Sequence, residues 1–211
     1  MPTAAIWLCA VLGYLCFWTW YVGWRGPLSR AEIERTMDLL ARDPEIDPDR
    51  RERMRGFLES DDGGEFFMVN LIRLQPEPVR GPEGGAPRPA AQLLQGYTGP
   101  FMRALLRRGG HPALAGRAAA GYLEAWGVEK NPGWSFVGCI RYRSRRDLAE
   151  LATMPQFAQI HAFKSAAMAN TLAFPIAPAR SFFSPRVVVG LAFALAAALA
   201  ELALGALAGS S

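Results

Sequence analysis

The stretch EFFMVNLIRL, Glu65–Leu74, has the composition of a strand that is buried on both faces, because apolar residues occupy seven of its ten positions. Two polar residues, Asn70 and Arg73, interrupt the apolar run. Side chains alternate between the two faces of a strand, so Asn70 belongs to the face of Phe66 and Arg73 to the face of Phe67. The alternation predicts that the two polar side chains cannot line one pocket unless a bulge intervenes.

The segments that follow this strand predict an α+β domain over residues 64–178. Periodicity and capping residues predict helices and strands in the order strand, helix, strand, strand, helix, strand. The first helix lies at 90–108 and the next two strands at 111–126 and 133–144. The second helical part consists of two helices at 144–154 and 155–170, and the last strand lies at 171–178. That order is the ferredoxin-like βαββαβ arrangement, an antiparallel sheet with helices on one face. The Pro/Gly-rich segment 75–90 is predicted to be an irregular, mobile loop, and Pro100 is predicted to start or kink the first of these helices.

The two ends of the chain predict transmembrane helices at residues 1–25 and 186–209. Residues 3–24 carry no charge, and a helix of that length is about 33 Å long, which is enough to span a bilayer. The second segment contains one acid, Glu201, which either shifts toward the interface by tilt or serves a proton-relay or helix-pairing role. Residues 26–63 are predicted to form a helical connector that starts with the capping box at Ser29 and Glu32.

The charges beside the two predicted spans indicate orientation. Arg25, Arg30 and Arg35 follow the first span, and Arg180 and Arg186 precede the second. Because positive residues stay on the cytoplasmic side, we expect a multi-pass protein of the inner (plasma) membrane with a cytoplasmic central domain. The formal net charge of +4 fits a domain beside an anionic leaflet, and no basic run interleaved with aromatics points to nucleic acid.

Four segments carry a resemblance to a known family: FFMVNLIRL, GGHPALAGR, WSFVGCIRYRSRRDLAELATMPQF and HAFKSAA. In order and spacing, residues 64–175 resemble the uncharacterised bacterial branch of the dimeric α/β-barrel superfamily, whose relatives include the antibiotic-biosynthesis monooxygenases and the EthD-like proteins. The resemblance implies a homodimer in which two four-stranded sheets face each other. It also implies a cleft in each subunit between the sheet and its helices.

Five polar or aromatic residues are candidates for such a pocket: Asn70, Tyr97, His111, Arg141 and His161. The two histidines could act as acid or base near neutral pH. Four of the candidates also have a structural alternative, which is a turn for His111, a solvated or bonded side chain for His161, a core aromatic for Tyr97 and a carboxylate partner for Arg141. The sequence contains no nucleophile elbow, phosphate loop, dinucleotide fingerprint or zinc-ligand spacing, so we expect no cofactor and no metal.

Two functions of different classes remain from the sequence. The first is a membrane-tethered binding or assembly module that holds a small apolar ligand or organises a partner. The second is a cofactor-independent enzyme of the monooxygenase or isomerase kind that acts on a hydrophobic substrate. Whether the chain is an enzyme stays open at this point, because fold analogy alone does not establish catalysis.

Overall fold

The computed structural model describes residues 2–43, 46–178 and 184–209, and the chain divides into two compact units. One unit contains both ends of the chain, and the other is Arg25–Ala177. The terminal unit consists of two apolar helices, whereas the central unit contains the sheet and the remaining described helices.

The terminal unit pairs α1 (Pro2–Val22) with α7 (Pro185–Gly209), and both helices are long and apolar enough to cross a membrane. The Trp7 indole N–H donates to Glu201 Oε2 at 3.0 Å, and the Tyr14 hydroxyl donates to the Arg186 carbonyl at 3.2 Å. Glu201 therefore has a hydrogen-bond donor on the neighbouring helix, which is the helix-pairing arrangement. Arg180, which contributed to the predicted orientation, lies outside the described residues.

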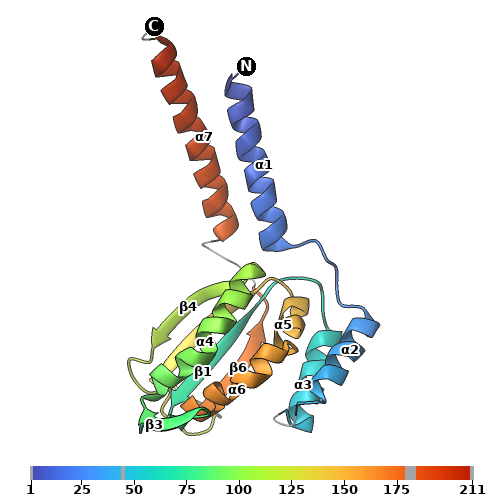
Figure 1. The fold of residues 1–211 in the computed structure, drawn as a ribbon, viewed down its shortest axis with the longest axis vertical. Helices are drawn as coiled ribbons and strands as arrows, with labels where there is room; N and C mark the ends of the chain where they lie inside the picture. The colour runs from blue at the N-terminus through green and yellow to red at the C-terminus, as the bar shows by residue number, and fades with distance from the viewer. Residues whose placement is uncertain (1, 44–45, 179–183, 210–211) are drawn as a thin grey trace. The chain divides into compact units, whose positions relative to one another are not determined.

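The connector forms two helices, α2 (Arg30–Leu40) and α3 (Pro48–Glu59). The predicted capping box begins α2, because the Ser29 side chain accepts from the Glu32 amide while the Ser29 amide donates to Glu32 Oε2 at 2.8 Å. The apolar faces of α2 and α3 pack on each other and on α5 (Arg145–Ala152). The three helices lie next to one another in Figure 1. The buried members of this cluster are Ile33, Met37, Leu40, Leu58 and Ala149.

A four-stranded antiparallel sheet forms the centre of the domain, so the predicted α+β class is confirmed. Its strands are β1 (Phe66–Leu74), β4 (His111–Arg117), β5 (Phe136–Tyr142) and β6 (Met168–Ile176), in the spatial order β4-β5-β1-β6. The apolar stretch Phe66–Leu74 is thus an inner strand, paired on both edges. A backbone with both edges hydrogen-bonded suits a continuous apolar run of this kind.

Helices α4 (Ala90–Arg107), α5 and α6 (Pro155–Ala167) lie over one face of this sheet (Figure 1). Phe66 and Tyr142, which are partners in the β1–β5 register, stack with ring centroids 4.9 Å apart beneath these helices. Burial of the helix stripes against this face forms the main core. Its buried members are Phe66, Ala104, Leu105, Tyr142, Leu151 and Phe157.

The opposite face of the sheet is largely apolar, with half-buried side chains on β1 and β5 and exposed ones on the edge strands β4 and β6. In the registers of the sheet, Val69 lies between Cys139 and Phe174, and Leu114 lies beyond Cys139, so one apolar row crosses all four strands. Exposed fractions are 66% for Leu114 and 43% for Phe174. We call this surface the open face, and it consists of Phe67, Val69, Leu71, Leu114, Val137, Cys139, Leu172, Phe174 and Ile176.

One prediction about local structure was wrong. Segment 75–90 is not irregular, because β2 (Val79–Gly81) and β3 (Gly84–Arg88) form an antiparallel hairpin within it. Gly84 and Gly85 adopt positive φ, which makes the tight turn possible, and Arg88 pairs with Glu83. Helix α4 covers Ala90–Arg107, which confirms the predicted range 90–108, and it does not start at Pro100. Packing of its apolar stripe on the core outweighs the hydrogen bond that proline cannot donate.

Candidate functional site

Two of the five predicted pocket residues, Tyr97 and His161, meet where α4 packs against α6. Their rings lie 6.3 Å apart in an edge-to-face arrangement, and the Nζ atom of Lys164 lies 5.5 Å from the centre of the Tyr97 ring. Phe101 stacks on Tyr97, and Phe157 meets Tyr97 edge-on. We call Tyr97, His161 and Lys164 the α4–α6 cluster.

A glycine allows the two helices of this cluster to approach. A Cβ atom at Gly96 would lie 2.9 Å from a ring carbon of Phe163 on α6, so any side chain there would force the helices apart. Pro155 occupies the first turn of α6, where its fixed φ favours the helix and its missing amide hydrogen costs nothing. His161 and Lys164 lie three residues apart on α6 and therefore face the same way.

Burial affects the protonation of Tyr97 and Lys164. Burial raises the pKa of Tyr97 to about 12, with a small opposing effect from the positive charge of Arg50 on α3, so the phenol stays a neutral hydrogen-bond donor. Burial also lowers the pKa of Lys164, and the charge of Arg50 lowers it further. Among the described residues, no carboxylate forms an ion pair with Lys164.

Arg141 and His111 lie elsewhere, at one end of the sheet. The Arg141 guanidinium is only 1% exposed, and its Nε donates to Glu65 Oε2 at 2.7 Å while Nη1 donates to the Gly109 carbonyl at 2.6 Å. His111 is the register partner of Arg141 on β4, and its Nδ1 lies 3.0 Å from the Pro112 carbonyl oxygen. The Arg141 guanidinium therefore already has an anionic partner and links the start of β1 to the turn before β4.

Asn70 and Arg73 have separate partners, as the alternation along β1 predicts. Asn70 Nδ2 donates to the Met68 carbonyl at 3.0 Å and to the Gly138 carbonyl at 3.4 Å. Arg73 Nη1 donates to Asn170 Oδ1 at 3.5 Å on the neighbouring strand β6. Both side chains therefore make polar contacts with strand neighbours.

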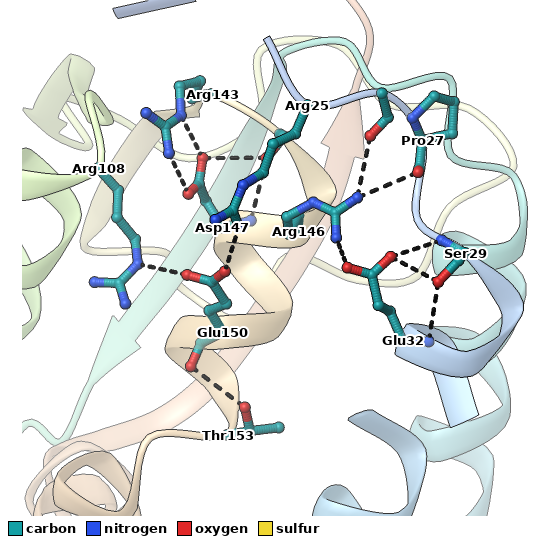
Figure 2. Close-up of polar contacts among 12 residues, drawn as sticks. Arg25, Pro27, Ser29, Glu32, Arg108, Arg143, Arg146, Asp147, Glu150 and Thr153 are labelled. Atoms are coloured by element: carbon teal, nitrogen blue, oxygen red, sulfur yellow. Dashed lines mark hydrogen bonds and ion pairs between the residues drawn. The ribbon is translucent and has the colours of Figure 1, made fainter. Parts of the chain in front are cut away.

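A polar network around α5 was not predicted from the sequence (Figure 2). Asp147 is almost fully buried and accepts two hydrogen bonds from Arg143, both at 2.8 Å. Arg146 pairs with Glu32 of the α2 capping box and also donates to the carbonyls of residues 26 and 27. The network therefore fastens the connector helices to the central domain.

Glu150 extends the same network between two cations. Its carboxylate oxygens lie 3.3 Å from Arg25 Nη1 and 3.3 Å from Arg108 Nε (Figure 2). The density of arginine in the sequence RYRSRRD was the available signal for such a cluster, but sequence alone did not indicate which acids would lie opposite. These contacts join three segments that are far apart in the chain.

Two open pockets in the described parts of the chain are lined by none of the five predicted residues. One, of about 470 Å³, lies between α1 and α7. The other, of about 370 Å³, lies between the end of α2 and the α5–α6 turn and is lined by Leu39, Leu40, Arg42, Asp43, Ala152, Thr153, Met154, Pro155 and Ala158. The described residues contain no group of three or more His, Cys, Asp or Glu side chains that could hold a metal ion.

Comparison with solved structures finds proteins of similar fold. Two crystal structures of the RPA0582 protein of unknown function from Rhodopseudomonas palustris, one of them methylated, match with TM-scores of 0.51 and 0.53 and sequence identities of 22% and 24%. The matches cover 64% and 65% of this chain and 98% and 97% of the other. A protein from Arabidopsis thaliana, At3g17210, aligns with a TM-score of 0.36, 14% identity and coverage of 56% of this chain and 99% of that one.

No protein-family model matches the sequence, and no curated protein matches it. The likeness to the RPA0582 protein therefore concerns the fold alone. Nearly all of that protein is covered, whereas about a third of this chain lies outside the match.

Proposed function

We propose that this chain is a membrane-anchored homodimer whose central domain has the ferredoxin-like α/β-barrel arrangement and serves as a small-molecule-binding or assembly module. The strand order β4-β5-β1-β6, together with the helical connections from β1 to β4 and from β5 to β6, supports the ferredoxin-like assignment. The RPA0582 structures are described as being of unknown function, so they contribute the fold and no activity.

The observation that carries the proposal is the open face. An antiparallel sheet that faces water on one side normally alternates apolar and polar residues, but β1 is apolar on both of its faces. The open face has exposed aliphatic and aromatic side chains on β4 and β6, and a contiguous exposed apolar surface marks an interaction site. A second copy of the same face supplies matching apolar rows about a two-fold axis, which is the commonest symmetry of soluble homo-oligomers.

The membrane part of the proposal rests on α1 and α7. Both helices expose apolar side chains along their length, which suits contact with lipid. Arg25, Arg30 and Arg35 follow α1 directly. We therefore place the central unit on the cytoplasmic side of the plasma membrane, with both short tails on the other side.

The oligomeric state of the full chain in detergent tests this proposal. Sedimentation equilibrium should give twice the protein mass of one chain for the wild type. Leu172→Glu and Phe174→Glu should each shift the equilibrium to the monomer, because a carboxylate would have to be buried in the apolar sheet contact. The matched control is Gln159→Glu, at an exposed position of α6, which should stay dimeric. A monomeric wild type would overturn the proposal.

An enzyme is the second candidate, and the contact between Tyr97 and His161 favours it. A phenol that stays protonated to high pH can donate a hydrogen bond to a substrate oxygen, and a neighbouring imidazole can move a proton. Mass spectrometry of the protein extracted gently in detergent would identify a retained apolar molecule. Under this second candidate, Tyr97→Phe would lower turnover of that molecule, whereas a simple binding module would release it unchanged.

A further inference from the structure

The loop between β4 and β5, residues 118–135, exposes apolar side chains. Among the described residues of the central unit, the two most exposed large apolar side chains lie in this loop: Leu123 is 95% exposed and Trp126 is 82% exposed. Val128 is exposed as well, and Gly127 adopts a positive φ that turns the chain between Trp126 and Val128. We call residues 123–130 the loop tip.

Hydrogen bonds hold the base of this loop on the sheet. The Ala118 amide donates to the Ser135 carbonyl at 3.1 Å, which continues the pairing of β4 with β5. The Ser135 hydroxyl accepts from the Leu74 amide at 2.8 Å, and the Trp134 indole N–H donates to the Tyr122 hydroxyl at 3.0 Å. The loop tip therefore projects from a base that is fixed to β1 and β5.

The base of the loop borders the open face. A Cβ atom at Gly133 would lie 3.8 Å from the Nε atom of Arg73, whose side chain belongs to the open-face side of β1 by alternation. Apart from Leu39 and Leu106, every exposed large apolar side chain among the described residues of the central unit belongs either to the open face or to this loop. A partner that covers the open face would therefore also meet the loop.

Position and charge favour a protein over lipid as the partner of the loop tip. Arg25 joins the central unit to α1 and pairs with Glu150, which also pairs with Arg108 shortly before β4. The loop follows the other end of β4, about 23 Å away along a seven-residue strand. The loop tip contains two glutamates and one lysine, and an anionic leaflet repels the resulting negative charge.

We propose that the loop tip is a dimerisation arm: Leu123, Trp126 and Val128 pack at the border of the open face of a second copy of the chain and extend the sheet-to-sheet contact. The inference rests on the homodimer proposed above and adds the residues that fasten it. Tryptophan is enriched among the few residues that contribute most of the binding free energy of an interface. Trp126 is therefore the anchor of the arm, and Leu123 and Val128 exclude water around it.

The affinity of the dimer tests the arm. Sedimentation equilibrium of the full chain in detergent, over a range of protein concentrations, gives the dissociation constant of the dimer. We expect Trp126→Ser to raise this constant by about thirtyfold, the loss typical of a residue that anchors an interface. The matched control is Leu106→Ser, which removes an exposed apolar side chain of α4 outside both surfaces and should leave the constant unchanged. Circular dichroism should show both variants folded like the wild type, because both side chains are exposed in the single subunit.

Cross-linking locates the contact. In a background with Cys9, Cys16 and Cys139 replaced by serine, Leu123→Cys is labelled with benzophenone maleimide in a mixture of ¹⁵N-labelled and unlabelled subunits, and is then irradiated. Peptide mass spectrometry should find the cross-link on a sheet strand of the other copy.

The outcomes separate the arm from the dimer itself. A dimeric wild type combined with an unchanged dissociation constant for Trp126→Ser, or with cross-links to detergent alone, would overturn the arm and leave the homodimer standing. A monomeric wild type would overturn both.

Discussion

Arg141 is the most deeply buried charged side chain among the described residues, and its environment explains why it is structural. A guanidinium removed from water is stable only when its hydrogen bonds and its charge are both satisfied. Glu65 supplies the charge, and the Gly109 carbonyl supplies a further acceptor. A Cβ atom at Gly110 would lie 2.8 Å from the Arg141 carbonyl oxygen, so the chain needs a glycine at this crossing.

We predict that Glu65→Ala destabilises the central unit strongly. Removal of one partner of a buried ion pair leaves an uncompensated charge, so the free energy of unfolding should fall by about 3 kcal/mol. Urea unfolding of the full chain in detergent, followed by circular dichroism, measures this loss. Glu34→Ala is the matched control, because the ion pair of Glu34 with Arg55 is exposed and should contribute little. Equal losses in the two variants would contradict this account of Arg141.

Tyr97 predicts a loss of stability at alkaline pH. Its pKa is about 12 in the folded state and close to 10 when the chain is unfolded, so the folded state holds the proton more tightly. The contribution of this group is therefore complete below pH 10 and is lost as the pH rises from 10 to 12. The measurement is the free energy of unfolding of wild type and Tyr97→Phe at pH 8 and pH 11. The variant should lose less stability between the two pH values, and an identical loss would refute the prediction.

At the level of elements, the contact between α4 and α6 shapes the candidate site. Gly96 lies within α4 where the ring of Phe163 approaches, and the helix stability that glycine costs is offset by closer packing. The polar network of α5 has a comparable role for the connector, because it fixes α2 by the pairing of Arg146 with Glu32 (Figure 2). Both contacts fix the relative position of two helices, which the apolar periodicity of each helix does not determine.

A pair of glycine substitutions tests this packing. Gly96→Ala should lower the free energy of unfolding by about 1–2 kcal/mol, because its Cβ would overlap Phe163. Gly56→Ala in α3 is the matched control: it is exposed, has no atom within 4 Å of its Cβ position and should raise stability by about 1 kcal/mol through helix propensity. Opposite signs in the two variants are expected. A stabilising Gly96→Ala would show that α4 and α6 are not in close contact there.

At the scale of the whole molecule, two apolar surfaces need to be shielded from water: the terminal helices α1 and α7, and the open face of the sheet. The terminal helices expose apolar side chains along their length, and the central unit combines an exposed apolar sheet face with charged helices. Contiguous exposed apolar surface of this kind marks a site of contact with another protein or with a membrane. In the proposed arrangement, lipid covers α1 and α7, and a second copy of the chain covers the open face.

Cysteine labelling in cells tests the proposed orientation. In a background with Cys9, Cys16 and Cys139 replaced by serine, Ser60→Cys lies in the central unit and Thr3→Cys lies at the start of α1. A maleimide that does not cross the plasma membrane should label Thr3→Cys in intact cells. It should label Ser60→Cys only after the membrane is permeabilised, because the central unit is expected to be cytoplasmic. The reverse pattern would invert the proposed topology.

The sequence by itself determined the elements whose signals are local. The capping boxes and caps at Ser29 and Ser144, the proline that begins α6 and the apolar run of β1 were all readable, because each depends on residues a few positions apart. The order of these elements along the chain was sufficient to predict the α+β class. The hairpin in segment 75–90 was missed, because its residues show glycine and proline but no apolar alternation.

Only the tertiary structure decided which distant residues meet. The sequence gives no indication that Arg141 faces Glu65, that Arg146 faces Glu32 or that Lys164 lies over Tyr97. These pairs are separated by dozens of residues, and their contacts depend on how helices dock on the sheet, which the period of a single element does not encode. The separation of Asn70 from Arg73 followed from strand alternation, whereas the contact of Lys164 with the Tyr97 ring depends on the close approach of α4 and α6 at Gly96.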